Sequence, residues 1–448
     1  MNSTPTTNPP SVDGHIIVEP DDDMPEIDSD VTSPPSLEDE KSGEPLSSSW
    51  REEPLTSDEA SKVTQILRAC RDQDRNQLIA LAATEGGFVE DHVRRLAWPI
   101  LLGRSEKHDN SEKWEDLPAH HDEAQVKLDV HRAFVHYPTG ESNKQIEGRK
   151  EELSSLITQI LRQHPCLCYF QGYHDIAQVL LLVLGAEEAA SLLARLSLLR
   201  IRDFMLPTIA ATNSHLQLLP AILYAADPVL CRHLSGTQPF FALAATLTLY
   251  AHDIEEYGGI ARLFDFLLAR EAVMSVYVYA TIIMTRKSEL LELGADEPEM
   301  LYAILCKLPK PLDLEDLVSR AISLFEDHRP ETLPFGAWRK VSSYSTLKTT
   351  RDSTAVARQT LQEGEKLLKK HSEEIERQVA RKKMLIRTRQ LAHRYRHPAR
   401  AVSLAVFIGV LSLCLGRSGQ TGGLHSILGT ARQRFVDVIG YTLGFVQK

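Results

Sequence analysis

An arginine and a glutamine within residues 126–175 have side chains of the kind that assist phosphoryl transfer. Arg132 follows Asp129 by three positions, so on a helix the two side chains share a face and the carboxylate can orient the guanidinium. Gln171 precedes Gly172 at the edge of an apolar segment, where the chain can turn tightly and the amide can point outward. Presented together, a cation and an amide could stabilise the charge on a transferring phosphoryl group and position a water molecule beside it.

The segments around these residues have the apolar spacing of helices. Residues 125–135 form the predicted helix that carries the arginine, and 149–163 form a second, amphipathic helix after a predicted loop at 140–148. Residues 175–185 are almost uniformly apolar, which predicts a buried helix. The same period of 3.6 residues recurs throughout 56–326 and strand signals are few, so the predicted fold class is all-α.

Composition separates this region from the first residues of the chain. Residues 1–55 are rich in Pro, Ser, Thr and acidic residues, and such a segment buries too little apolar surface to offset its ordering entropy, so a disordered acidic tail is predicted. The formal net charge of −11 argues against nucleic acid as a partner. Six cysteines scattered through 448 residues indicate a reducing, cytosolic setting rather than a disulfide framework.

The last part of the chain has a different charge pattern. Residues 327–397 are predicted to be a linker followed by a charged helix, and 381–400 contain eight Lys or Arg residues and no Asp or Glu. Residues 401–416 carry no charge, which predicts a C-terminal membrane anchor within 398–448 whose basic flank keeps the preceding domain on the cytosolic side. A weaker apolar stretch at 424–446 could lie along the membrane surface or pair with the first as a shallow hairpin.

Three motifs carry a family resemblance. They are Arg-Leu-Ala-Trp-Pro-Ile-Leu-Leu-Gly at Arg95–Gly103, Val-x-x-Asp-x-x-Arg at Val126–Arg132, and Tyr-x-Gln-Gly at Tyr169–Gly172. In this order, within a helical region at 56–326, they resemble the TBC-domain Rab GTPase-activating proteins, in particular their membrane-anchored, early-secretory-pathway branch. The resemblance implies the all-α TBC fold for that region.

The resemblance also implies roles for individual residues. Arg132 would be an arginine finger, supplied in trans to the GTP-bound form of a Rab-family GTPase, and Gln171 would replace the water-positioning glutamine of that GTPase. Asp129 would hold Arg132, and Tyr169 would pack beneath the pair and touch the switch regions of the Rab. No cofactor and no metal are implied for this chain.

Other positions would support this site. Arg95 and Trp98 would be structural residues of the first motif, and a buried tryptophan is above all a large apolar area. Gly172 would form the turn that presents the glutamine. Two departures from the family pattern leave every catalytic group in place: Ala133 follows the arginine where Thr or Ser is common, and Tyr173-His174 replaces Met-Asn.

The predicted function is therefore activation of GTP hydrolysis by a Rab, through a dual arginine and glutamine finger, in vesicle transport between the endoplasmic reticulum and the Golgi. The protein would be an activator rather than an enzyme in its own right. It would lie on the membrane of the endoplasmic reticulum or early Golgi, with the TBC domain facing the cytosol. The alternative is a catalytically silent, membrane-tethered adaptor that binds a Rab.

Two metal sites are weaker alternatives. An adjacent His-Asp pair can bind divalent ions in phosphohydrolases, but His174-Asp175 lacks further ligands in a recognisable pattern. The ligands that could be proposed for such a site are His131, His136, His164, Asp203 and Asp227. A zinc site at Cys166 and Cys168 lacks a second ligand cluster, so buried core thiols are the preferred interpretation. No P-loop motif is present, so no nucleotide site is predicted in this chain.

Overall fold

The computed structural model describes residues 54–103 and 113–417. The predicted disordered tail at 1–55 lies outside these ranges except for its last two residues. Within the described ranges every regular element is a helix, which confirms the all-α prediction.

The helices follow one another in chain order. The first group is α1 (Ser57–Arg71), α2 (Arg75–Ala83), α3 (Asp91–Leu102), η1 (Trp114–Asp116), α4 (Glu123–His131), α5 (Asn143–Gln163), α6 (Tyr173–Leu184) and α7 (Ala186–Leu199). The second group is α8 (Ala210–Leu216), α9 (Leu218–Ala226), α10 (Pro228–His233), η2 (Leu234–Gly236), η3 (Pro239–Ala242), α11 (Leu243–Leu247), α12 (Tyr257–Ala269), α13 (Met274–Thr285), α14 (Lys287–Glu292), α15 (Pro298–Leu305) and α16 (Leu314–Asp327). The last group is η4 (Pro330–Thr332), η5 (Pro334–Gly336), α17 (Ala337–Lys340), α18 (Thr346–Thr349), α19 (Ser353–Arg358) and α20 (Leu361–Arg417).

Local capping explains where two of these helices begin. At the start of α1 the Thr56 hydroxyl accepts from the Glu59 amide, while the Glu59 carboxylate accepts from the Thr56 amide at 2.9 Å. Ser142 and Gln145 form the same capping box at α5. Because this cap lies upstream of the apolar stripe, α5 begins at Asn143, and the loop predicted at 140–148 is wrong from residue 143 onward.

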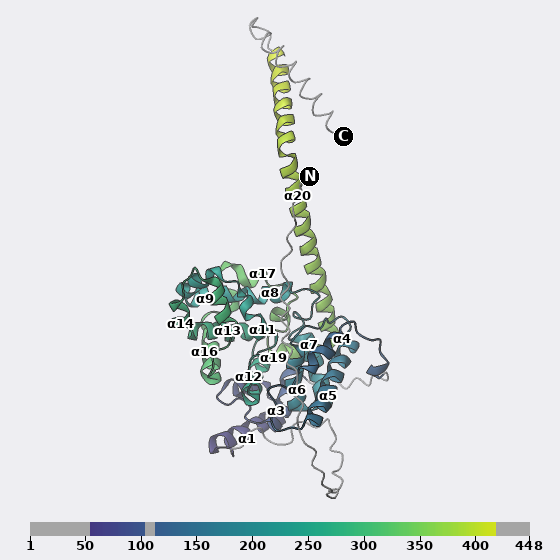
Figure 1. Ribbon diagram of the computed structural model, residues 1–448, viewed down its shortest axis with the longest axis vertical. Helices are drawn as coiled ribbons and strands as arrows, with labels where there is room; N and C mark the ends of the chain where they lie inside the picture. Colours follow the sequence, from purple (N-terminus) through teal and green to yellow (C-terminus); the bar gives the residue numbers. More distant parts are fainter. Residues whose placement is uncertain (1–53, 104–112, 418–448) are drawn as a thin grey trace, which may run out of the picture. The chain divides into compact units, whose positions relative to one another are not determined.

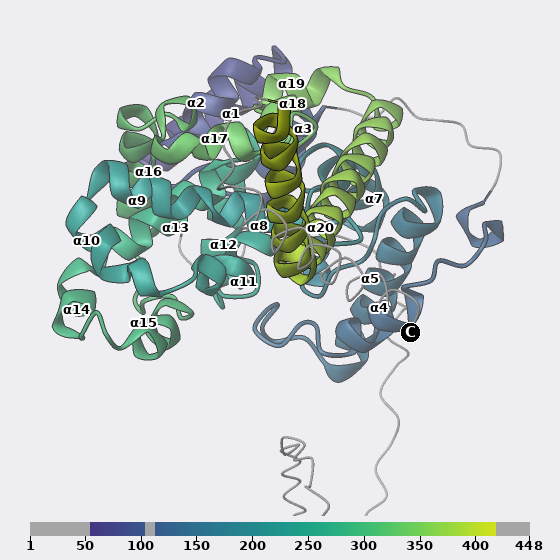
Figure 2. The same cartoon turned by 90° about the horizontal axis from the view of Figure 1, so that it is seen from above.

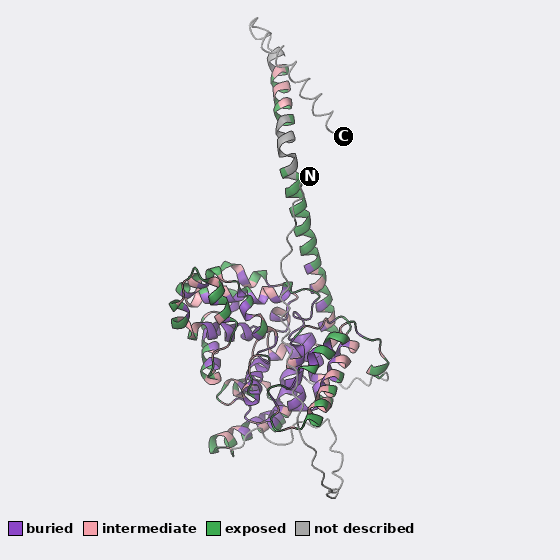
Figure 3. Ribbon diagram, in the orientation of Figure 1, coloured by how far each residue is buried: buried purple, intermediate pink, exposed green. Residues whose placement is uncertain are grey.

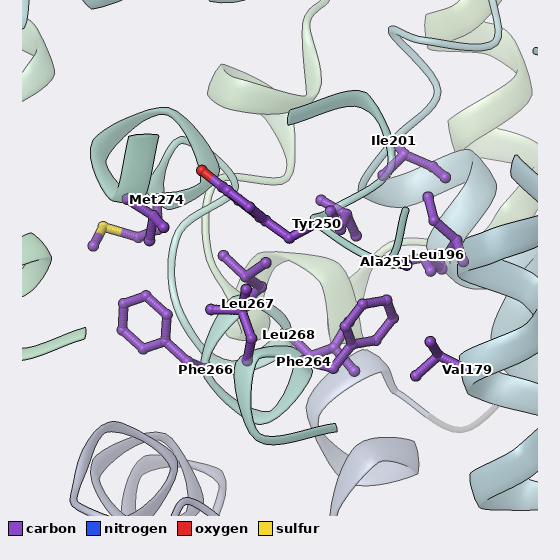
Figure 4. Close-up of a cluster of buried hydrophobic side chains, with 14 of the residues drawn as sticks. Val179, Leu196, Ile201, Tyr250, Ala251, Phe264, Phe266, Leu267, Leu268 and Met274 are labelled. Atoms are coloured by element: carbon purple, nitrogen blue, oxygen red, sulfur yellow. The ribbon is translucent and has the colours of Figure 1, made fainter. Parts of the chain in front are cut away.

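The buried helix α6 lies at the centre of the packing. All of its residues except Asp175 are buried, which confirms the prediction from its apolar composition. It contacts α3, α5, α7 and α12. Figure 4 shows the core beside it, where Val179 of α6, Leu196 of α7, Phe264 of α12 and Met274 gather with neighbouring apolar side chains. This core holds α6 in place, and the candidate glutamine lies in the turn just before that helix.

The helices form two neighbouring groups. Helices α3 to α7 pack against one another, and α9, α13 and α16 form a second set of contacts, while α12 contacts α2, α3, α6 and α16 and so joins the two. Figures 1 and 2 show α4 and α5 on one side of the domain and α9, α13 and α14 on the other. The segment with Arg132 therefore belongs to the first group.

The core does not end at residue 326, where the predicted domain does. Leu347, Val356, Leu368 and Ile375 are all buried, and α19 packs on α3 while the start of α20 packs on α7. Figure 3 shows the change along α20 from buried to exposed residues, and residues 376–391 are all exposed. The segment predicted as a linker thus contributes to the hydrophobic core up to the first turns of α20.

The apolar run predicted to anchor the chain lies in the last part of α20. Among the residues that the structure describes, no helix is both long enough and apolar enough to cross a bilayer. The charge-free run at 401–416 is bounded by Arg400 and Arg417, so it falls short of the roughly 20 apolar residues that a spanning helix needs. The predicted transmembrane helix is therefore not confirmed, and the second apolar stretch at 424–446 lies outside the described residues.

Candidate functional site

Arg132 lies at the end of α4 rather than within a helix. Its backbone has φ −97° and ψ 7°, and its amide donates to the Asp129 carbonyl at 3.0 Å. Two residues later Phe134 takes a left-handed conformation with φ 61°, and its amide donates to the Gln178 side chain of α6 at 3.0 Å. The prediction of a helix through Val135 is therefore wrong at its C-terminal end, because a contact with α6 redirects the chain there.

The carboxylate of Asp129 is fully buried and accepts three hydrogen bonds. Oδ1 accepts from Arg132 at 2.8 Å and from Gln125 at 3.0 Å, and Oδ2 accepts from the Tyr169 hydroxyl at 3.0 Å. Since two other donors already fix the carboxylate, it offers the guanidinium a rigid anchor. The Arg132 side chain is 64 % exposed, so the spacing argument correctly predicts the Asp129 contact, and much of the guanidinium's hydrogen-bonding capacity faces solvent.

Gln171 lies in the turn that leads into α6, and its side chain is exposed. Before the turn, the Tyr169 amide donates to the Asp122 carboxylate at 2.9 Å. Gly172 follows with φ 100°, a conformation that L side chains rarely adopt. A Cβ at this position would also lie 2.6 Å from Cγ2 of Thr248. Both the backbone angle and the nearby Thr248 side chain therefore require glycine directly after Gln171.

A hydrogen bond between two side chains joins the two halves of the site. The Tyr169 hydroxyl donates to Asp129 across 40 positions in sequence, and α4 also contacts α6. Arg132 lies three residues from one partner of this bond, and Gln171 lies two residues from the other. The structure therefore connects the segments that carry the two groups, and it buries neither group.

Two histidines and a carboxylate extend this hydrogen-bonded set beyond Tyr169. Nδ1 of His174 lies 3.2 Å from the Tyr169 oxygen, and its Nε2 lies 3.3 Å from Oδ1 of Asp175. The second oxygen of Asp175 lies 3.1 Å from Nδ1 of His252, in the chain after α11. Burial lowers the pKa of His174, whereas the hydrogen bond to Asp175 raises the pKa of His252. From sequence, His174 stands out as a departure from the family pattern and as half of a His-Asp pair, whereas no motif marks His252.

The first motif forms a separate buried network. Nε1 of Trp98 donates to Asp265 at 2.8 Å, and the neighbouring Arg94 is fully buried between Asp91 at 2.8 Å and Asp265 at 3.1 Å. Arg95 instead donates to the Val183 carbonyl of α6 at 2.7 Å. Arg94 and Asp265 were not predicted, although an acidic residue within the apolar run of α12 is a signal that it needs a buried partner.

The alternative phosphohydrolase site is not assembled. Asp203 is bound to His215 at 2.8 Å, Asp227 pairs with Lys287, and His164 pairs with Glu365 at 2.7 Å. Within the described ranges, a single group of three close residues could hold a metal ion, at His120–Asp122, and it includes neither His174 nor Asp175.

The prediction that Cys166 and Cys168 are buried core thiols is wrong. Cys166 is exposed and Cys168 is half-buried, because both lie in the turn between α5 and α6 rather than on an inward helical face. Both are free thiols.

An all-helical domain thus presents an arginine and a glutamine from two segments that one tyrosine joins. Residues 91–291 match the model of the Rab-GTPase-TBC domain. The chain is 35 % identical over 277 residues to TBC1 domain family member 20 of Bos taurus, covering 61 % of this chain and 68 % of that protein. It is 32 % identical over 272 residues to GTPase-activating protein gyp10 of Schizosaccharomyces pombe, covering 59 % of this chain and 72 % of that protein.

A solved structure, the Ypt/Rab-GAP domain of Gyp1p, aligns with a TM-score of 0.46 and 14 % identity over 60 % of this chain and 99 % of that chain. On the sequence matches, the chain belongs to the Rab-GTPase-TBC domain family.

Proposed function

We propose that this protein accelerates GTP hydrolysis by a Rab-family GTPase, with Arg132 and Gln171 completing the hydrolytic site of the Rab in its GTP-bound form. Family membership supports the activity. The observation that carries the assignment of residues is the exposed Arg132 guanidinium on a fully buried Asp129 carboxylate, which Tyr169 ties to the turn bearing Gln171. Asp129 holds one edge of the guanidinium, and the other edge faces solvent, where it could bind the negative charge of a Rab-bound phosphate group.

The chemistry follows from what limits a small GTPase. Charge develops on the phosphate oxygens as the γ-phosphoryl group transfers, and the attacking water must be held in line. Arg132 would stabilise the charge, and the Gln171 amide would orient the water. An arginine finger accelerates hydrolysis by roughly 10³–10⁵-fold, which corresponds to about 4–7 kcal/mol of barrier.

The test is a panel of purified GTP-loaded Rabs, each mixed with the full chain and followed by single-turnover phosphate release. At least one Rab should be accelerated, and Arg132→Ala should remove about three orders of magnitude or more of that acceleration. Gln171→Ala should lower the rate as well. Arg320→Ala is the matched control, because Arg320 is similarly exposed, at 60 %, and pairs with Asp316 at 2.8 Å in α16.

Two results would refute the catalytic assignment. If Arg132→Ala and Gln171→Ala left hydrolysis by every accelerated Rab unchanged, neither residue would act on GTP. If the chain bound Rabs and accelerated none of them, the adaptor would be the correct function.

The substrate and the membrane also belong to this proposal. We propose that the Rab is one that drives transport between the endoplasmic reticulum and the Golgi, as the branch resemblance implies, and that residues 398–448 attach the protein to that membrane. A chain ending at residue 397 should keep its activity in solution and leave the membrane fraction of cells. Retention of this truncated chain on membranes would refute attachment through 398–448.

A further inference from the structure

We infer that His174 is a positioning residue for the arginine, which acts by holding the Tyr169 hydroxyl on Asp129. This inference rests on the proposed function, because it assigns to His174 the orientation of the group that would act on GTP. Among the described residues, no hydrogen bond joins His174 to Arg132. Its effect passes through two hydrogen bonds, from the imidazole to the phenol and from the phenol to the carboxylate.

The hydrogen-bonding capacity of Asp129, Tyr169 and His174 determines which group donates and which accepts in these two hydrogen bonds. The Tyr169 oxygen lies 3.0 Å from Oδ2 of Asp129 and 3.2 Å from Nδ1 of His174. A carboxylate can only accept, so the single hydroxyl proton of Tyr169 goes to Asp129. Nδ1 of His174 must then carry a proton and donate it to the phenol oxygen, which defines the tautomer of the ring.

Because His174 and Asp129 are buried, water cannot readily replace either of them as a hydrogen-bond partner of Tyr169. The His174 side chain is 11 % exposed and the Asp129 side chain is fully buried, so water cannot easily satisfy either partner of Tyr169. Burial lowers the pKa of His174 and favours a neutral ring with one proton. Asp175, whose Oδ1 lies 3.3 Å from Nε2, opposes that shift through its negative charge.

The set spans three segments that are distant in sequence. Asp129 belongs to α4, His174 to α6, and His252 reaches Asp175 at 3.1 Å from the chain after α11. Without the imidazole, the Tyr169 hydroxyl loses one of its side-chain partners and gains freedom to rotate away from the carboxylate that orients Arg132. A misplacement of about 1 Å in a catalytic group can cost up to 10²-fold in rate, so we expect a loss of about 10-fold in kcat.

The test compares variants of the full chain with the most accelerated Rab, measuring kcat and KM separately. His174→Leu introduces an apolar side chain of similar volume in place of the imidazole, and it should lower kcat about 10-fold with KM within about two-fold. His174→Asn places an amide N–H near the position of Nδ1 and should recover most of that loss. A side chain that serves packing alone would not distinguish these two replacements.

A double-mutant cycle tests whether the effect passes through the phenol. In a Tyr169→Phe background, His174→Leu should lower kcat by no more than about two-fold, because the hydroxyl that it positions is gone. Tyr173→Phe is the matched control: it removes another buried hydroxyl, bonded to Ser197 at 2.6 Å outside this chain of contacts, and should leave kcat unchanged.

The outcomes separate this inference from the proposed function. If no Rab is accelerated by the wild-type chain, the proposed function fails. If wild type is active and Arg132→Ala is not, yet His174→Leu matches wild type, the inference alone is overturned. Equal losses in His174→Leu and His174→Asn, or a full loss from His174→Leu in the Tyr169→Phe background, would also overturn it.

Discussion

Asp265 offers the sharpest test of how the first motif stabilises the domain. This carboxylate is fully buried on α12 and accepts from the Phe88 amide at 2.9 Å, from Arg94 at 3.1 Å and from the Trp98 indole at 2.8 Å. Asp265→Asn keeps the size of the side chain but removes its charge and replaces one acceptor oxygen with a donor. Arg94 then keeps Asp91, at 2.8 Å, as its one carboxylate partner.

The magnitude follows from these contacts. Removing one partner of a buried ion pair costs about 3–5 kcal/mol, and the remaining Asp91 places the charge term near the lower end, at about 3 kcal/mol. A donor left facing the new amide group adds about 1 kcal/mol. The expected loss of about 4 kcal/mol is a large share of the roughly 5–15 kcal/mol that stabilises a typical domain. Trp98→Phe removes one donor to this carboxylate and keeps an aromatic ring, so it should cost about 1.5–3 kcal/mol through that bond.

The assay is urea unfolding of the full chain followed by circular dichroism, with the midpoint and slope compared among variants. Asp316→Asn is the surface control, because this residue pairs with Arg320 on the exposed face of α16 and should change stability by less than about 1 kcal/mol. A loss below about 1 kcal/mol for Asp265→Asn would show that Arg94 does not depend on this carboxylate, and the reasoning would be refuted.

Three further predictions concern the turn, the pH dependence and the C-terminal helix. Gly172→Ala should destabilise the domain by about 1–3 kcal/mol and slow Rab activation, since φ is +100° and the new Cβ meets Thr248. Adding Thr248→Ser should restore only the loss caused by the contact with Thr248, as measured by thermal melting and phosphate release. Hydrogen bonds from Arg162 lower the pKa of Glu123 to about 2, so the stabilisation from this ion pair is present above the unfolded-state pKa near 4.5 and is lost as the pH falls toward 2. Between these two pH values the unfolding free energy of the wild type should fall more steeply than that of Glu123→Gln. A chain ending before α20 should melt at a lower temperature than the full chain, because two buried apolar side chains of α20 contribute about 3–6 kcal/mol. A chain ending at residue 380 keeps both side chains and should match the full chain. Equal melting temperatures for the full chain and the chain without α20 would contradict this prediction.

Local patterns predicted much of the helical framework. The buried α6 follows from an apolar run, the start of α1 from the capping residues at Thr56 and Glu59, and the pairing of Arg132 with Asp129 from a spacing of three. Each of these depends on residues within one or two turns, so the sequence contains the whole physical cause. The end of α4 was predicted four residues too late, because Gln178 of α6 redirects the chain and no local signal announces it.

The sequence by itself determined the all-α class of fold and nominated Arg132 and Gln171 as candidate site residues, because helical period, caps and short motifs act over a few positions. Tertiary structure alone decided that Tyr169 reaches Asp129, that Asp265 neutralises Arg94 from 171 positions away, and that the start of α20 completes the core. Those contacts form where distant segments bury polar groups that must then find partners, and packing rather than sequence proximity chooses the partner.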